Sequence, residues 1–264
     1  MNKKIRADKL VVYQGLAENT RKARALIMAG LVFFQQERVE KSGQLLDKEL
    51  DLILKEKLPF VSRGGLKLAE ALEEFKFSVD DKAAADLGAS TGGFTDCLLQ
   101  RGARKVFAVD VDTRQLDWNL RKDPRVVLIN KNARYLEKKD FSDTLDLITM
   151  DVSFISVLKI LPAIKDLLEN GDLISLIKPQ FEVRKEQAGK KGIVQDPGLH
   201  EEVMIRIIDQ AQDMGFHVKG VTGTSIQGQK GNREFFIMWS LNSDCLSPRN
   251  LKNLVKEVAW NAKS

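Results

Sequence analysis

The pattern of apolar and polar positions changes along the chain and divides it into two parts. In residues 6–55, apolar positions first recur at helical spacing, which predicts two short helices. Thr20 is expected to cap the second helix and Gly30 to end it. Apolar runs at 31–34 and 50–54 then indicate strands. A segment of about 50 residues lies near the lower limit for an independent core, so we expect a small α+β module.

From residue 83 onward, short apolar strands alternate with helical segments, and a further helix is expected at about 66–75. Strands separated by helices need crossover connections, which predicts an α/β domain with a Rossmann-like, mostly parallel sheet. The expected strands are 83–87, 105–109, 126–129, 145–150, 173–177, 217–222 and 234–240. We therefore expect the module to span 1–58, an interdomain linker 59–65 and the larger domain 66–264.

Positive charge is concentrated in the N-terminal part. The chain has a formal net charge of +5, and residues 1–60 carry 12 Lys or Arg against 8 Asp or Glu, so the remainder is nearly neutral. A basic module of this kind favours a polyanionic partner. A solvated basic surface would give the same composition.

Cysteine and histidine usage excludes several classes of site. Cys97 and Cys245 lie far apart without metal-ligand spacing, which predicts a reducing compartment and no disulfide framework. The only histidines are His200 and His217, so we expect no metal centre. The charged start has no following apolar run of a signal peptide, and no apolar stretch approaches the roughly 18–20 residues that span a bilayer. The expected location is the cytoplasm.

A glycine-rich segment, residues 86–94, follows the first strand of the larger domain. Its small residues allow the backbone to turn tightly and approach a ligand at a helix N-terminus. Asp110 ends the next strand, 22 residues after Gly88, where a carboxylate can accept hydrogen bonds from ribose hydroxyls. Together these features favour a site for an adenosine-containing cofactor over a structural turn.

The acid two residues before the first glycine of this segment resembles the first motif of class I methyltransferases. That resemblance favours S-adenosylmethionine over NAD and implies that Asp86 supports the methionine part of the cofactor. Asn132 follows the third strand, where the family contacts adenine, although a surface polar residue fits that position equally well. The expected cofactor-binding residues are Asp86, Gly88, Ala89, Ser90, Gly92, Gly93, Phe94, Asp110 and Asn132.

Four charged residues lie where open α/β sheets place their sites. Asp151 and Lys178 each follow an apolar strand, Lys67 begins the helix before the first strand, and Glu234 enters the last strand. A lysine that ends an apolar strand is unusual, because burying an ammonium is costly unless it is paired. The alternative is that the four residues form two structural salt bridges.

Over nearly its whole length the sequence resembles the TlyA (hemolysin A) group of FtsJ-like ribosomal RNA ribose 2′-O-methyltransferases. The matching segments are 62–68, 86–93, 149–154, 177–182 and 231–235. The resemblance implies a catalytic set of Lys67, Asp151, Lys178 and Glu234, and a cytidine ribose in ribosomal subunits as the substrate. We expect Lys178 to act as the general base, Lys67 and Asp151 to orient it and the hydroxyl, and Glu234 to hold the network.

The N-terminal part resembles an S4 domain, in which a helix pair binds structured RNA. The expected phosphate contacts are Lys9, Arg21, Lys22 and Arg24, with ordinary helix surface charge as the alternative. The pair Gln35-Gln36 departs from the Asn-Gly turn that S4 domains often carry. Further RNA contacts are expected from Arg63 and from a loop that contains Arg184, Lys185, Lys190 and Lys191, for which simple solvation is the alternative.

Two other functions remain open at this point. A secreted or membrane-active hemolysin is disfavoured because the sequence lacks a signal peptide and a membrane span. A non-catalytic RNA-binding ribosome factor is disfavoured because all four charged residues are present.

Overall fold

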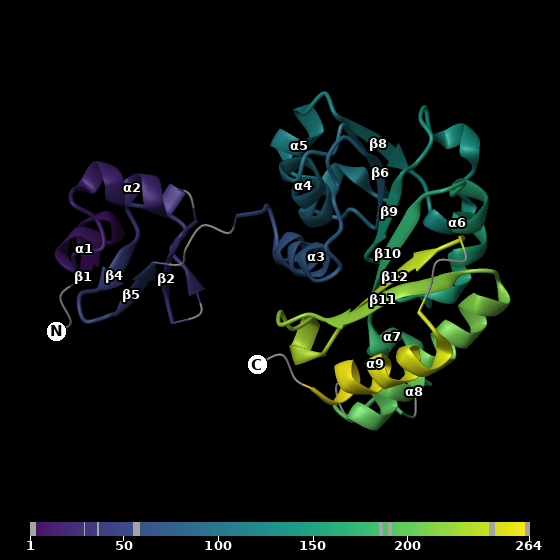
Figure 1. Cartoon of the computed structure of the whole chain (residues 1–264). Helices are drawn as coiled ribbons and strands as arrows, with labels where there is room; N and C mark the ends of the chain where they lie inside the picture. Colours follow the sequence, from purple (N-terminus) through teal and green to yellow (C-terminus); the bar gives the residue numbers. More distant parts are fainter. Residues whose placement is uncertain are drawn as a thin grey trace. The chain divides into compact units, whose positions relative to one another are not determined.

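The computed structural model describes residues 4–28, 30–35, 37–54, 59–184, 187–189, 192–242 and 246–261. The chain forms two compact units, Met1–Leu58 and Pro59–Ser264 (Figure 1).

The N-terminal unit combines two helices with short antiparallel strands. Its helices are α1 (Ala7–Tyr13) and α2 (Thr20–Met28). Strands β2 (Val32–Phe34), β3 (Glu37–Arg38) and β5 (Leu52–Leu54) form one sheet in the order β3-β2-β5, and β1 (Lys4–Arg6) pairs with β4 (Leu45–Asp47). Leu10, Val11, Ile27, Val32 and Val39 are buried together in its core. The expected α+β module is therefore present.

The start of α2 differs from the expectation. Asn19 rather than Thr20 caps the helix, because the Asn19 side-chain oxygen accepts a hydrogen bond from the Lys22 amide at 2.9 Å. Thr20 is the first helical residue. Gly30 lies just beyond the helix with φ +69°, a conformation that favours glycine at such an end.

The larger unit is built on a seven-stranded sheet with the order β11-β12-β10-β9-β6-β7-β8. Its strands are β6 (Ala83–Leu87), β7 (Lys105–Asp110), β8 (Val126–Asn130), β9 (Leu147–Met150), β10 (Asp172–Ile177), β11 (His217–Gly223) and β12 (Phe235–Ser240). The five strands from β10 to β8 are mutually parallel, whereas β12 runs antiparallel to both of its neighbours. This confirms the mostly parallel α/β sheet.

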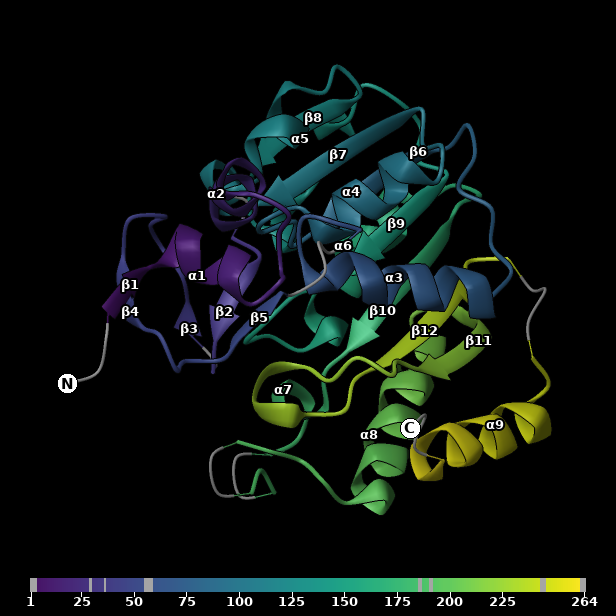
Figure 2. The ribbon, with the colours of Figure 1, turned by 90° about the vertical axis from the view of Figure 1, so that its left-hand side faces the viewer.

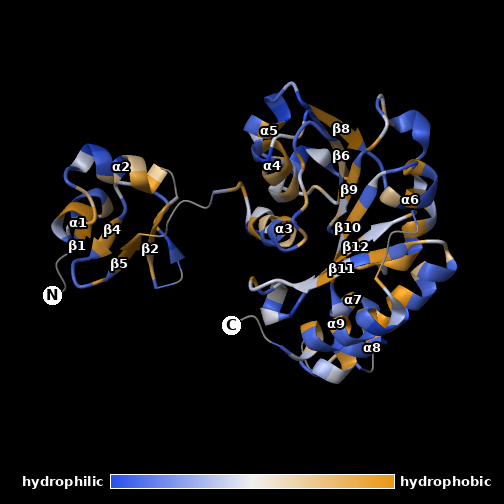
Figure 3. Ribbon diagram, in the orientation of Figure 1, coloured by the Kyte–Doolittle hydropathy of each residue, from blue (hydrophilic) through white to orange (hydrophobic). Residues whose placement is uncertain are grey.

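Helices cover both faces of this sheet (Figures 1 and 2). Apolar residues of α3 (Arg63–Glu74), α4 (Gly93–Gln100) and α5 (Trp118–Lys122) form one core layer with the strands. Residues of α6 (Leu161–Leu167), α8 (Pro197–Asp213) and α9 (Pro248–Trp260) form the other. Figure 3 shows the same division, with apolar strands inside and hydrophilic outer helix faces.

The remaining helical elements are short. They are α7 (Pro179–Glu182) and the 3₁₀ helices Thr113–Gln115, Ala133–Tyr135, Lys138–Asp140, Val157–Lys159 and Gln229–Gly231. Among the helices that the structure describes, none is both long and apolar enough to cross a membrane.

The segment expected as a linker, residues 59–65, is part of the larger unit. The Gln100 side chain donates to the Pro59 carbonyl at 2.9 Å, and the Val61 amide donates to the Asp96 carboxylate at 2.8 Å. Helix α3 begins at Arg63, three residues before the expected start. Gly65 lies in its first turn, where the helix approaches the start of α4 closely: a Cβ on Gly65 would lie 2.8 Å from the backbone oxygen of Gly93.

Candidate active site

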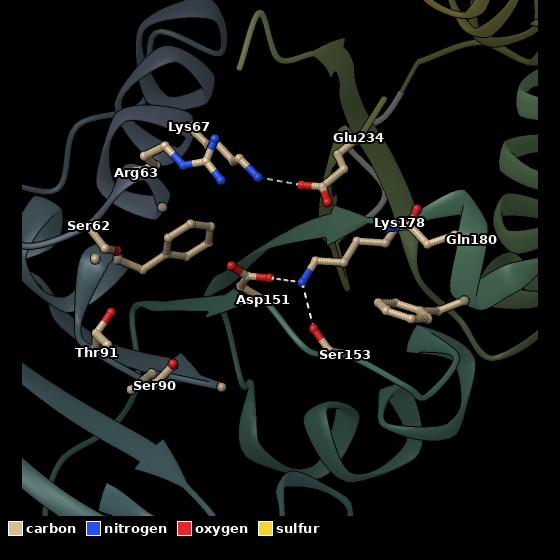
Figure 4. A pocket seen from close by; sticks show the side chains of 16 residues that line it. Ser62, Arg63, Lys67, Ser90, Thr91, Asp151, Ser153, Lys178, Gln180 and Glu234 are labelled. Carbon is tan, nitrogen blue, oxygen red and sulfur yellow. Dashed lines mark hydrogen bonds and ion pairs between the residues drawn. The ribbon is translucent and has the colours of Figure 1, made fainter. Parts of the chain in front are cut away.

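Two adjoining cavities lie at the carboxyl ends of β6, β7, β9 and β10. The first, here called the charged cavity, is lined by residues that include all four of the charged residues singled out above (Figure 4). The second, here called the Asp110 cavity, is lined by residues that include Asp110 and Asn132. Both cavities are lined by Gly88, Ser90, Asp151 and Ser153, so they meet at the glycine-rich loop and at the end of β9.

The glycine-rich loop is fixed by backbone hydrogen bonds to the neighbouring strand. The amides of Gly88 and Ala89 both donate to the Val109 carbonyl, at 2.9 and 3.1 Å. Gly88 has φ +87°, and a Cβ there would overlap the Asp151 carbonyl oxygen, so only glycine fits. The Ser90 amide donates to the Asp110 carboxylate at 2.9 Å. The loop and Asp110 therefore form one rigid edge of the Asp110 cavity.

Asp86 lies beneath this loop and lines neither of the two cavities. It is completely buried, and the Thr95 hydroxyl donates to its carboxylate at 2.6 Å. Burial raises the pKa of Asp86 to about 7, and the negative charge of Asp151 contributes in the same direction. Asp86 therefore supports the loop from below, and its contact with the methionine part of the cofactor stays a prediction.

The other expected cofactor residues divide between the two cavities. Gly88, Ala89, Ser90, Gly93 and Phe94 line the charged cavity, and Gly88, Ser90, Asp110 and Asn132 line the Asp110 cavity. Gly92 lines neither: it precedes α4 with φ +97°, and a Cβ there would overlap Leu120. The Asn132 side chain accepts a hydrogen bond from the Arg134 amide at 3.0 Å, so it also shapes the turn after β8.

The four charged residues form two ion pairs that face the charged cavity. Lys67 Nζ lies 2.6 Å from the Glu234 carboxylate, and Lys178 Nζ lies 2.5 Å from Asp151 Oδ1. Lys178 also donates to the Ser153 hydroxyl at 3.0 Å. Figure 4 shows both pairs projecting into the same space. The pairing is the one that the salt-bridge alternative predicts, but both pairs border a cavity instead of being sealed in the core.

Glu70 ties the element that carries Lys67 to the loop that precedes Glu234. Its carboxylate accepts hydrogen bonds from the Thr224 hydroxyl at 2.9 Å and from the Ser225 amide at 3.0 Å. Glu70 lies one helical turn after Lys67 on α3, so these hydrogen bonds hold the two sides of the Lys67–Glu234 ion pair together. No local pattern indicates this role, because Glu70 and its partners are more than 150 positions apart.

Glu182 makes the corresponding connection for the second ion pair. Its buried carboxylate accepts a hydrogen bond from the Val157 amide at 2.8 Å, and burial raises the pKa of Glu182. This bond joins α7, which follows Lys178, to the segment that follows Asp151. On that segment Phe154 is 85% exposed with φ +64°, and its ring lies 4.9 Å from the ring of Phe181.

The expected RNA-binding cations of the N-terminal unit are all exposed but differ in their partners. Arg24 lies 2.8 Å from the buried Asp8, and Lys22 lies 2.7 Å from Glu18. Within the described part of the unit, Lys9 and Arg21 have no ion-pair partner. These two cations are therefore the most available for an anionic ligand.

The remaining expected RNA contacts belong to the larger unit. Arg63 is exposed and lines the charged cavity, and Arg184 is exposed. Lys185, Lys190 and Lys191 lie outside the described residues, as does Cys245. Across the described ranges, no three His, Cys, Asp or Glu side chains gather as a metal-holding group.

Comparison with known proteins assigns both parts of the chain. Residues 60–241 match the model of the FtsJ-like methyltransferases, and residues 5–53 match that of the S4 domain. The chain therefore belongs to the FtsJ-like methyltransferase family and carries an S4 domain before the family's catalytic fold.

Several known proteins match the chain over most of its length. It is 48% identical over 240 residues to YqxC of Bacillus subtilis, by name a candidate rRNA methyltransferase, covering 89% of this chain and 85% of that protein. It is 38% identical to the 16S/23S rRNA (cytidine-2′-O)-methyltransferase TlyA of Mycobacterium tuberculosis, covering 97% of both. A solved structure from Streptococcus thermophilus, described as a hemolysin, is 44% identical with a TM-score of 0.75, covering 98% of this chain and 95% of that one.

The buried Asp86 predicts that stability depends on pH. Its pKa is about 7 in the folded protein and about 3.9 in an unfolded chain. Between these values the folded state keeps a proton that the unfolded state has lost, so the free energy of unfolding falls as the pH rises from about 4 to about 7. Asp86→Asn has no such proton, so its free energy of unfolding should not show this decrease with pH. Between pH 4 and pH 8, the free energy of unfolding of the variant should rise relative to that of the wild type by up to about 4 kcal/mol.

Urea unfolding of both proteins at several pH values measures this difference. Thr95→Val, which removes the hydrogen bond but keeps the carboxyl, serves as the control and should retain the pH dependence. Parallel pH profiles for the wild type and Asp86→Asn would contradict the assignment.

Proposed function

We propose that the protein uses S-adenosylmethionine to methylate the 2′-hydroxyl of a ribose, in a cytidine of ribosomal RNA in the cytoplasm. The observation that carries the proposal is the pair of lysine–carboxylate contacts in the charged cavity, directly beside the glycine-rich loop. The name of the 38% identical relative TlyA supports the choice of cytidine and of ribosomal RNA.

The residues of the Asp110 cavity fit an adenosine-containing methyl donor. Gly88 and Ser90 leave the loop side of the cavity without large side chains, and Asp110 lies at its edge with a carboxylate that can accept from ribose hydroxyls. Asn132 lies on the same cavity, where it would contact adenine. When bound, this cofactor supplies a methyl group already activated on a positively charged sulfonium.

The charged cavity fits a ribose hydroxyl that must lose a proton as it attacks. Lys178 Nζ is the candidate acceptor of that proton, and Asp151 and Ser153 fix its position through the contacts described above. Before it can accept a proton, Lys178 must release its own. Lys67, which lines the same cavity, is the candidate to orient the hydroxyl. Glu234 keeps Lys67 in place. Most of the rate would come from alignment, since the methyl group is already activated.

The N-terminal unit would bring the RNA to this cavity through phosphate contacts that position without reading sequence. Lys9 and Arg21 are the candidates there, and Arg63 and Arg184 are candidates on the larger unit. The exposed ring of Phe154, which packs against Phe181 of the charged cavity, offers a surface on which a base of the RNA can stack. The hemolysin name belongs to the Streptococcus structure, and nothing in the described residues favours membrane lysis over methyl transfer.

Replacing Lys178 should stop methyl transfer without stopping cofactor binding. Lys178→Ala removes the proton acceptor, and the rate of transfer should fall by about 10²- to 10⁴-fold, the usual contribution of a general base. The measurement is transfer of tritiated methyl from S-adenosylmethionine to ribosomal subunits that lack the modification, with cofactor affinity from calorimetry. Lys159→Ala, at an exposed lysine outside the cavity, is the matched control and should behave as the wild type. Turnover retained in Lys178→Ala would remove Lys178 from this role.

Loss of the two unpaired cations of the S4 domain should weaken RNA binding and its dependence on salt. In Lys9→Ala/Arg21→Ala, the slope of log affinity against log salt should become less steep by about 2, because each phosphate contact contributes about one unit. Binding to ribosomal RNA at several salt concentrations tests this. Lys22→Ala, whose charge is already paired with Glu18, should have a smaller effect. An unchanged slope in the double variant would place the RNA elsewhere.

A further inference from the structure

Gln180 is a polar residue of the charged cavity that has no part in the chemistry described above. It lies in the first turn of α7, two residues after Lys178, and its side chain lines the charged cavity (Figure 4). Its side-chain oxygen Oε1 is buried and has no hydrogen-bond partner among the described residues. An unpaired buried acceptor costs about 1–3 kcal/mol, so its position in a cavity points to a ligand that supplies the missing donor.

The position of Gln180 indicates which ligand that is. Gly88, Ser90, Asp151 and Ser153 border both cavities, whereas Gln180 borders only the charged cavity. If the cofactor occupies the Asp110 cavity, its methyl group lies near the residues that line both cavities. Gln180 then lies on the other side of these residues from the cofactor. That is the side on which the RNA nucleotide must enter.

The chemistry of an RNA nucleotide then restricts the donor. Within a chain the phosphodiester has no hydrogen to donate, and the ribose has only its 2′-hydroxyl. The proton of that hydroxyl is directed to Lys178 in the proposed reaction. The remaining donors of the nucleotide are on its base. A primary amide presents an acceptor beside a donor, which complements the exocyclic amine and the adjacent ring nitrogen of cytosine.

We propose that Gln180 reads the base of the target nucleotide: its Oε1 accepts a hydrogen bond from the exocyclic amine, and its Nε2 donates to the adjacent ring nitrogen. Gln180 is thus a specificity residue, and this assignment rests on the proposed methyl transfer to RNA. The contact would position the ribose through its base, on the same wall of the cavity as Lys178.

The test combines a variant with a change in the RNA. Gln180→Met keeps the length of the side chain but removes both hydrogen-bonding groups, and Gln212→Met makes the same change at an exposed glutamine on α8. The substrates are ribosomal subunits that carry, at the mapped target, either cytidine or pyrimidin-2-one riboside, which is cytidine without its amine. A synthetic RNA fragment ligated into the ribosomal RNA introduces the analogue. The quantities measured are kcat/KM for methyl transfer, cofactor affinity and thermal stability.

With the wild type and Gln212→Met, removal of the amine should lower kcat/KM by about 10- to 100-fold, the range of a bidentate base contact. With cytidine, kcat/KM of Gln180→Met should be lower than the wild-type value by a similar factor. Replacing cytidine by the analogue should then lower kcat/KM of this variant only a little further, because the contact is already absent. Its cofactor affinity should equal that of the wild type.

Two results would overturn the inference: a wild-type enzyme indifferent to the amine, or an amine effect of equal size in the wild type and in Gln180→Met. The first needs no variant, so the inference stays testable if Gln180→Met does not fold. Failure of the wild type to methylate any subunit is a different result, and it would count against the proposed function itself.

Discussion

The contact between Lys178 and Asp151 organises the larger unit at its functional edge. The two residues follow β10 and β9, which are adjacent parallel strands, so the sheet itself brings an ammonium and a carboxylate to the same edge. Neither charge would be stable alone in a partly buried position, since an unpaired charge there is costly. The Asp151 carbonyl also lies against Gly88, which couples this ion pair to the glycine-rich loop by direct contact.

The rest of the site is arranged to hold this geometry. Lys67 and Glu234 form a second ion pair in the same cavity, from helix α3 and from the residue before β12, which are distant in sequence. Glu70 and Glu182 each join two of these elements by hydrogen bonds to a neighbouring loop. A cavity held at both ends in this way suits a reaction that depends on aligning two groups and moving one proton. The same rigidity leaves Gln180 facing the cavity with an unused acceptor.

Periodicity and strand-end chemistry predicted most of this from the sequence. The seven expected strands of the large sheet are present within one or two residues, and the four charged residues singled out in the sequence line one cavity. The errors fall where a contact in space overrides the local pattern. The segment 59–65 is joined to α4 by hydrogen bonds that no local pattern encodes. Strands β1, β3 and β4 were missed because their sequences, KIR, ER and LLD, lack an apolar run like VFF in β2 or LIL in β5.

The chemical identity of the methylated product decides whether this cavity methylates a ribose oxygen. Ribosomal subunits lacking the modification would be incubated with the wild-type protein and isotope-labelled S-adenosylmethionine, and their RNA digested to nucleosides for mass spectrometry. We expect to find the label in 2′-O-methylcytidine. A label on the base of any nucleoside, or no label although the cofactor binds, would contradict it.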